Sequence, residues 1–176
     1  MLPNELIIYL YKLNQIYYYE KYFLNQNCIL KIKCGIMYKR ILLPTDGSEH
    51  SLREVERAKH VLAEDGEIII LSVAIKIRKT AFHREKDVME MNREAVKEAE
   101  DNVKAMADCF DDSFNVRTMV KVGFPSEQIN VVAEDEDCDL IIIASSGVSG
   151  IHKFVLGSVA ENVLKECEKD VLLIHN

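Results

Sequence analysis

Two segments rich in glycine and serine near the C-terminus hold the residues best suited to bind an anion. One is Ala144–Gly150, which follows an apolar run, and the other contains Gly157 and Ser158. Glycine tolerates backbone conformations and close approaches that other residues resist. Gly157 and Ser158 also open an expected helix, whose first N–H groups and dipole favour an anion. Phosphate oxygens could therefore bind to backbone amides near Gly147 and Gly157, and to the hydroxyls of Ser146 and Ser158.

An ordinary turn followed by a serine helix cap explains the same pattern, and spacing alone favours that structural interpretation. The segment is not a P-loop, because no Gly-Lys-Ser or Gly-Lys-Thr stands at the spacing of that motif. His152 and Lys153 lie between the two glycine clusters, and we assign them to a solvated loop.

A carboxylate follows the first apolar run of the regular part of the chain, in the sequence Pro44-Thr45-Asp46-Gly47-Ser48. If that run is a parallel strand, Asp46 lies at its carboxyl end, where ligands bind in open α/β sheets. A carboxylate there accepts hydrogen bonds from ribose hydroxyls or an adenine amine and repels phosphates. We therefore place Asp46 at the nucleoside end of a ligand. The competing interpretation is that Asp46 or Ser48 merely caps the next helix.

The histidines, cysteines and acidic stretches form no catalytic or metal-binding pattern. None of the five histidines has a nucleophile at a recognisable elbow or a partner at metal spacing. The five cysteines are scattered, which predicts reduced thiols. The acidic stretch from Glu134 to Asp137, with Asp139, predicts a solvated helix end. Because no general base with an orienting partner is recognisable, an enzyme is the weaker expectation.

Charge and hydropathy argue against two classes of partner. The 176 residues carry a formal net charge of -7, from 29 acidic and 22 basic side chains, and no basic face is visible. A nucleic-acid backbone would therefore be repelled. No run approaches the roughly 18 apolar residues that a membrane span needs, since the run Leu6–Tyr11 is interrupted at Lys12 and Asn14. We expect a cytoplasmic protein that binds neither nucleic acid nor membrane.

Residues 1–36 differ in composition from the rest of the chain. They hold six of the seven tyrosines, and their apolar residues follow neither a sustained helical period nor a clean alternation. Three interpretations compete: a targeting peptide, an additional helix or disordered leader, and upstream sequence before a true start at Met37. Glu5 and the lack of an Ala-x-Ala site argue against a signal peptide. We predict a domain boundary at Met37, with one domain over residues 37–176.

From Met37 onward, short apolar runs alternate with longer amphipathic segments, which is the pattern of β-α-β units. The continuous apolar runs Ile68–Leu71 and Leu140–Ile143 suit parallel strands that helices cover on both faces. The expected strands are Lys39–Pro44, Glu67–Val73, Val116–Val122, Asp139–Ala144 and Val171–His175. The expected helices are Ser51–Ala63, Arg84–Cys109, Ser126–Glu136 and Ser158–Glu168.

Local signals support these helices. Ser51 and Glu54 have the spacing of a capping box. An apolar stripe also runs along the second helix, formed by Val88, Met91, Ala95, Ala99, Val103 and Met106. Right-handed crossovers then give an α/β fold, a Rossmann-like, doubly wound five-stranded parallel sheet. Its ligand site should lie at the strand ends near Pro44, Val73, Gly123 and Ala144.

Three segments resemble the universal stress protein family: Met37–Ser48, Val122–Pro125 and residues 144–162. The resemblance spans residues 37–176 and implies the adenine nucleotide alpha hydrolase-like version of the fold. ATP-binding members of the family have the pattern G-x-x-G, nine residues, then glycine and serine or threonine. Gly147 and Gly157-Ser158 match it, with nine residues between the glycines, and Ala144 stands in place of the first glycine.

The resemblance implies that ATP, with Mg or Mn, is the ligand. The implied adenine and ribose pocket is Pro44, Thr45, Asp46 and Val73, and Gly147, Gly157, Ser158 and Val159 would hold the phosphates. Ala144 and Ser146 complete the predicted ATP-binding residues. If residue 144 is extended with negative φ, alanine fits and keeps its amide for the ligand. A positive φ would cost about 1 kcal/mol or more. The strand leading into Ala144 favours the extended case.

The same resemblance implies an ATP-binding homodimer with a regulatory or stress-response role. The dimer would form through the final strand, Val171–Ile174, which we expect at a sheet edge, because an unpaired apolar edge is a template for pairing. One alternative is a protein-interaction module of the same fold that binds no nucleotide. Another is a slow ATPase.

Overall fold

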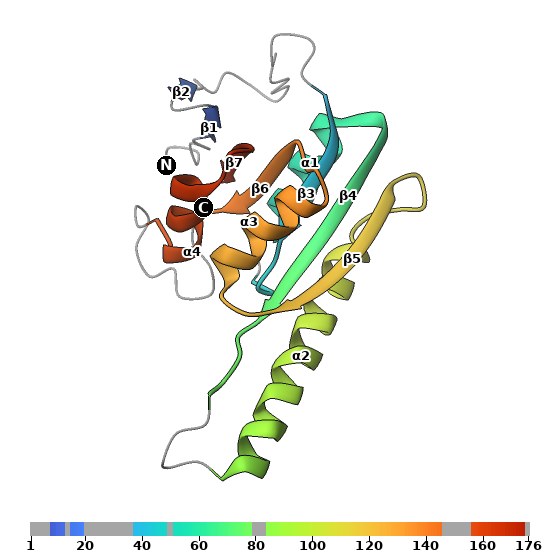
Figure 1. Ribbon diagram of the computed structural model, residues 1–176. Coiled ribbons are helices and arrows are strands. Elements are labelled where there is room, and N and C mark those ends of the chain that lie inside the picture. The colour runs from blue at the N-terminus through green and yellow to red at the C-terminus, as the bar shows by residue number, and fades with distance from the viewer. Residues whose placement is uncertain are drawn as a thin grey trace, which may run out of the picture.

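The computed structural model describes residues 8–12, 15–19, 37–48, 51–78, 84–145 and 156–174. Within them, seven strands form one sheet in the order β2-β1-β7-β6-β3-β4-β5 (Figure 1). The strands are β1 (Ile8–Lys12), β2 (Gln15–Tyr19), β3 (Tyr38–Pro44), β4 (Leu62–Ala74), β5 (Asn115–Val122), β6 (Leu140–Ala144) and β7 (Asp170–Ile174). The helices are α1 (Ser51–Val61), α2 (Glu85–Ala107), α3 (Pro125–Asp135) and α4 (Ser158–Glu166).

Strands β3 to β7 form the expected five-stranded parallel sheet. β3 pairs in parallel with β4 on one side and with β6 on the other, and β5 and β7 extend the sheet outward. The chain therefore builds one half of the sheet from β3 to β5 and then crosses back to β6. The predicted doubly wound α/β fold is confirmed, and its switch in strand order lies between β3 and β6.

Helices cover both faces of this sheet. On one face, α1 and α2 bury residues such as Val55 and Met106 against alternate strand side chains, including Ile41. On the other face, α3 and α4 bury Val132 and Val163 against the intervening strand residues (Figure 1). Because β4 and β6 are covered on both sides, their apolar runs are continuous instead of alternating. This burial fixes the strand ends that form the candidate site.

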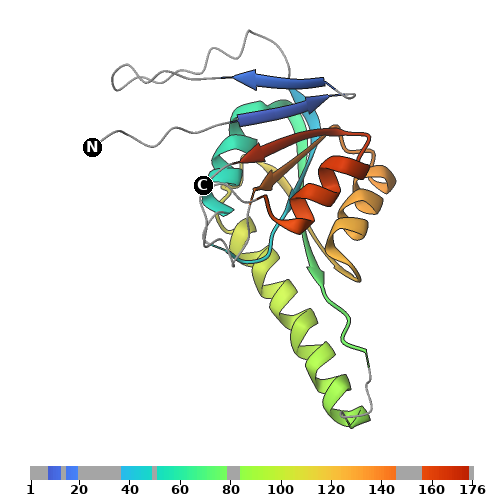
Figure 2. The same cartoon turned by 90° about the vertical axis from the view of Figure 1, so that its left-hand side faces the viewer.

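The first two strands form an antiparallel hairpin on the outer side of β7 (Figure 2). Residues 8–11 of β1 pair with residues 171–174 of β7 in antiparallel register. The prediction that β7 lies at a sheet edge is therefore wrong for the full chain. In its described residues the leader is strand, not the additional helix that was one alternative. The domain boundary at Met37 stays a prediction.

The predicted boundary between the first helix and the second strand shifts, and the predicted apolar stripe of the second helix is only partly buried. β4 begins at Leu62, directly after α1, because this residue pairs with Tyr38 before a register shift in the ladder. The sequence placed this residue in the helix. Helix α2 extends beyond the sheet (Figure 2). Of its predicted apolar stripe, Met91 is 38% exposed, whereas Val88, Ala99 and Met106 are buried.

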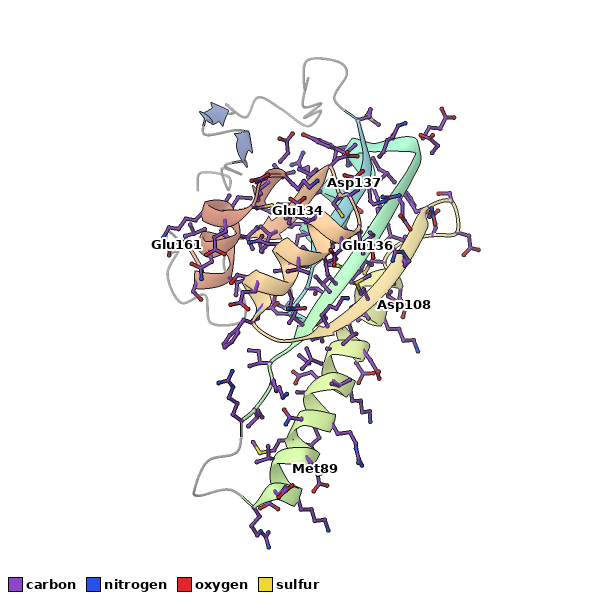
Figure 3. The ribbon with its side chains drawn as sticks, in the orientation of Figure 1. Met89, Asp108, Glu134, Glu136, Asp137 and Glu161 are labelled. Carbon is purple, nitrogen blue, oxygen red and sulfur yellow. The ribbon has the colours of Figure 1, made fainter. Side chains whose placement is uncertain are left out.

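The acidic stretch at the end of α3 lies far from the carboxyl ends of the strands and is held by ion pairs. Figure 3 shows Glu134, Glu136 and Asp137 together at this helix end. Glu136 contacts Arg117 at 2.6 Å, and Lys169 lies 3.4 Å from Glu134 and 3.5 Å from Asp137. Among the described residues, no group of three or more potential metal ligands is present.

Other predictions from the sequence concern side chains elsewhere in the fold. His60 lies on α1, with its Nδ1 atom 2.5 Å from the Glu56 carbonyl oxygen. The remaining histidines, at positions 50, 83, 152 and 175, fall outside the described residues. Cys109, Cys138 and Cys167 are free thiols. Within the described ranges, no helix combines the length and hydrophobicity of a membrane span.

Candidate nucleotide site at the strand switch

A cavity of about 600 Å³ opens at the carboxyl ends of the parallel strands, where the strand order reverses. All the predicted site residues that the structure describes line this cavity: Pro44, Thr45, Asp46, Val73, Ala144, Gly157, Ser158 and Val159. They come from four separate segments. The other two predicted residues, Ser146 and Gly147, lie outside the described residues.

The loop after β3 is held by its own hydrogen bonds. The Thr45 N–H donates to the Leu71 carbonyl at 2.8 Å, which ties the loop to β4. The Ser48 N–H donates to Asp46 Oδ1 at 3.0 Å, so Asp46 stabilises its own turn. This carboxylate also lies on the cavity wall. The turn-capping and ligand-facing interpretations of Asp46 are therefore geometrically compatible.

Gly47 in this loop has a φ of +76°, in the left-handed region that L side chains rarely adopt. A Cβ atom at this position would collide with the side-chain amide of Asn102 on α2. Asn102 also lines the cavity. The backbone angle therefore requires glycine here, and a methyl group would in addition have to displace the Asn102 side chain.

The start of α4 faces the cavity with its first turn. The Gly157 N–H donates to the Ser145 carbonyl at 2.6 Å, and the helical hydrogen bonds begin with the Glu161 N–H, which donates to the Gly157 carbonyl at 2.9 Å. The N–H groups of residues 158–160 therefore precede the helical ladder and are the donors suited to an anion. The Gly157 N–H group is not one of these donors, because it already donates to Ser145. With φ −67° and ψ 147°, Gly157 has a backbone that any residue could adopt.

Ala144 is the last residue of β6, and Asp137 is the only described non-glycine residue with positive φ. The expectation that residue 144 is extended and tolerates a methyl group is thus confirmed. However, the Ala144 N–H group is not available to a ligand, because it already has an acceptor. The Ala144 N–H donates to Glu54 Oε1 at 2.6 Å.

Glu54 is the main feature of this site that the sequence did not predict. The capping box expected at Ser51 and Glu54 is wrong for Glu54, because its carboxyl group bonds to Ala144 across the fold and not to the start of its own helix. The side chain is only 3% exposed and lines the cavity. Burial raises the pKa of Glu54 to about 8; the Ala144 hydrogen bond opposes this shift, and the nearby charge of Asp46 adds to it.

Helix α2 forms one wall of the cavity, which the sequence analysis did not predict. Ala95, Glu98, Ala99 and Asn102 line the cavity from one face of this helix. Ala95 and Ala99 belong to the predicted apolar stripe, and Glu98 and Asn102 follow at helical spacing beside it. This spacing could have indicated a shared face, but not that the face meets the loop after β3. Among the described lining residues, the acidic side chains are Asp46, Glu54 and Glu98, and none is basic.

The model of the universal stress protein family matches residues 37–175. The chain belongs to this family. Universal stress protein MJ0577 of Methanocaldococcus jannaschii is 35% identical over 160 residues, covering 80% of this chain and 96% of that protein. Universal stress protein MJ0531 of the same organism is 32% identical over 142 residues, covering 78% of this chain and 82% of that protein.

Solved structures of the family share the fold. The structure of MJ0577 aligns with a TM-score of 0.66 at 34% identity, covering 80% of this chain and 98% of that one. Universal stress protein UspA from Lactobacillus plantarum aligns with a TM-score of 0.67 at 20% identity, covering 80% of this chain and all of that one (100%). At 20% identity, the similarity to UspA shows a shared fold and nothing further. The family assignment predicted from the sequence is thus confirmed.

Proposed function

We propose that this universal stress protein binds ATP, with Mg or Mn, in the cavity at the strand switch, and that it has a regulatory or stress-response role in the cytoplasm. The proposal rests on one observation: eight predicted residues from four segments of the chain line the same cavity. Its volume of about 600 Å³ is typical of small-molecule sites, which span roughly 300–1,000 Å³.

The lining supports one orientation of the nucleotide. Leu71, Val73 and Ile129 supply apolar surface for a base. Asp46, on the loop after β3, is suited to ribose hydroxyls or an adenine amine. The first turn of α4 supplies N–H donors and the hydroxyl of Ser158 for phosphates. The base and ribose therefore lie against β3 and β4, and the phosphates against α4.

A divalent cation fits this arrangement because the charged residues that line the described part of the cavity are acidic. A triphosphate would need compensating positive charge there. The described residues contain no cluster of protein ligands for a metal, so the ion would be held chiefly by the phosphates, as Mg²⁺ commonly is. Such an ion would neutralise the triphosphate and fix its conformation.

Regulation by ATP requires that the nucleotide bind two states of the protein with different affinities. The interaction module that binds no nucleotide is the second candidate function. One observation favours it: the Ala144 amide, which the family resemblance assigns to the ligand, is already bonded to Glu54 at 2.6 Å. Slow ATP hydrolysis stays a further alternative.

The homodimer through the C-terminal strand is a separate proposal. The structure changes its geometry, because β1 covers the outer edge of β7. Two β7 strands can pair only when β1 is displaced or absent. We therefore propose that dimerisation through β7 belongs to a form of the chain without this contact.

The nucleotide proposal is tested by mass spectrometry of small molecules released from protein purified without added nucleotide. We expect ATP or another adenine nucleotide at a stoichiometric level. Asp46→Ala should weaken ATP and AMP binding by a similar factor, because the proposed contact is with the nucleoside. Protein that purifies without nucleotide and does not take up added ATP would support the interaction module instead.

A further inference from the structure

Glu54 is a buried acid on the wall of the cavity. Its side chain is 3% exposed, and its Oε1 atom accepts the Ala144 N–H at 2.6 Å. Among the described residues, this is the one hydrogen bond that the Glu54 carboxyl group makes. The carboxyl group lies where α1 meets the end of β6 and lines the same cavity as Asp46 and Ser158.

We propose that Glu54 determines the ligand specificity of this site. It accepts the Ala144 N–H, which is then no longer available to the ligand, and it donates its own O–H group to a neutral acceptor on the nucleoside. This inference rests on the proposed function, that the cavity holds a nucleotide. The acceptor would be a sugar hydroxyl oxygen or a ring nitrogen of the base. A phosphate is the less suitable partner, because the carboxylate of Asp46 is near enough to raise the pKa of Glu54 and would repel a phosphate placed beside it.

The chemistry follows from the two oxygens of the carboxyl group. In the neutral acid, the carbonyl oxygen accepts the Ala144 N–H and the other oxygen carries a proton that it can donate. In the ionised acid, both oxygens are acceptors only. Because burial raises the pKa of Glu54 to about 8, the donor form predominates at pH 7 and is lost above pH 8.

Ionisation would also add charge to a wall that is already acidic. Asp46 faces Glu54 from the loop after β3, and Glu98 lines the cavity from α2 beside the neutral Asn102. The lining residues of β4 and β6 are not titratable: they are Leu71, Ser72, Val73, Ala74, Ile143 and Ala144. Arg57 lies one turn further along α1, outside the cavity lining. The described lining residues thus supply no basic partner for an ionised Glu54.

The ligand affinity should therefore fall as the pH rises through the pKa of Glu54. If the ionised form does not bind, the apparent dissociation constant increases on the order of tenfold between pH 7 and pH 9 for a pKa of about 8. Adenosine is the cleanest probe, because it has no phosphate that titrates. Mg-ATP at the same pH values then tests whether the phosphates change the dependence.

The experiment is calorimetric titration of adenosine and Mg-ATP between pH 7 and pH 9 into the wild-type protein and Glu54→Gln. Glutamine keeps a carbonyl acceptor for Ala144 and an N–H donor for the ligand, and it does not titrate. We expect binding at pH 7 within a few-fold of wild type and a constant affinity up to pH 9. Glu54→Ala, with circular dichroism to check its fold, should likewise remove the pH dependence while weakening adenosine binding.

The matched control is Glu56→Gln, on the same helix but with a side chain that is 65% exposed and paired with Lys59. It should keep the wild-type pH dependence. If the wild type binds but its affinity is constant with pH, or if Glu54→Gln keeps the decline, the role of Glu54 is refuted. If the wild type binds neither ligand at pH 7, the proposed function fails, and the inference fails with it.

Discussion

Substitution of Gly47 by alanine should destabilise the fold and disturb the candidate site together. Two terms add in the folded state. A left-handed backbone costs an L-residue about 1–2 kcal/mol, and Gly47 has a φ of +76°. The new Cβ atom must also displace the side-chain amide of Asn102 on α2, but this is the far end of a flexible side chain, so the added cost is small. The expected loss of unfolding free energy is therefore about 1–2 kcal/mol, chiefly from the backbone.

Thermal unfolding followed by circular dichroism measures this loss. For a chain of this size, each 1 kcal/mol lowers the melting temperature by about 2–4 °C, so Gly47→Ala should melt roughly 2–8 °C lower than wild type. Gly123→Ala is the matched control. Its backbone is not left-handed, and the nearest atom to its Cβ would be Gln128 Cγ at 3.0 Å, on a side chain that can move. We expect the control to remain within about 1 kcal/mol of wild type.

A double-mutant cycle separates the two terms. Asn102→Ala in the Gly47→Ala background should relieve the crowding but not the backbone strain, so the coupling energy should be smaller than the backbone term. If Gly47→Ala melted at the same temperature as Gly123→Ala, the left-handed turn packed against α2 would be refuted.

Three other perturbations test different parts of the molecule. Because the folded pKa of Glu54, about 8, exceeds its usual value of 4.5, the wild type should lose stability relative to Glu54→Gln as the pH rises from 4.5 through 8. The slope should be at most about 1.4 kcal/mol per pH unit, and urea unfolding curves with a constant difference would contradict it. Removal of residues 1–36 should uncover β7 and increase the dimer fraction in light scattering, with little change in melting temperature; a strict monomer at micromolar concentrations would exclude this dimer. Ser158→Ala should weaken Mg-ATP binding about tenfold or more, because a hydrogen bond to a charged group contributes about 1.5–3 kcal/mol, and unchanged affinity would remove Ser158 from the site.

The parts of the fold that were predictable from the sequence are those fixed by continuous or periodic apolar patterns. The run Leu140–Ile143 is buried on both faces, and a strand with that environment cannot alternate. Ala99, Val103 and Met106 keep the helical period of α2 because the sheet covers them. The cavity followed from the strand order, which brings the ends of β3 and β6 together.

The features that were missed depend on contacts between distant residues. Glu54 has the local spacing of a capping box, yet its partner is Ala144, 90 residues away in the chain. Asn102 meets Gly47 only after α2 has packed on the sheet. The hairpin of β1 and β2 has no clear alternation in the sequence, and its position depends on pairing with β7. Local sequence patterns predict helices and strands, but they do not predict which distant residues these helices and strands contact.

Calorimetric titration of Mg-ATP into the wild-type protein and into Gly157→Val tests directly whether the cavity binds ATP. Gly157 has an ordinary extended backbone, with φ −67° and ψ 147°, so valine should fit the chain and fill the space beside the first turn of α4. We expect saturable binding to the wild type with a dissociation constant below millimolar, and loss of binding in the variant with an unchanged circular dichroism spectrum. No detectable heat of binding to the wild type at millimolar Mg-ATP would refute the ATP site and favour the interaction module.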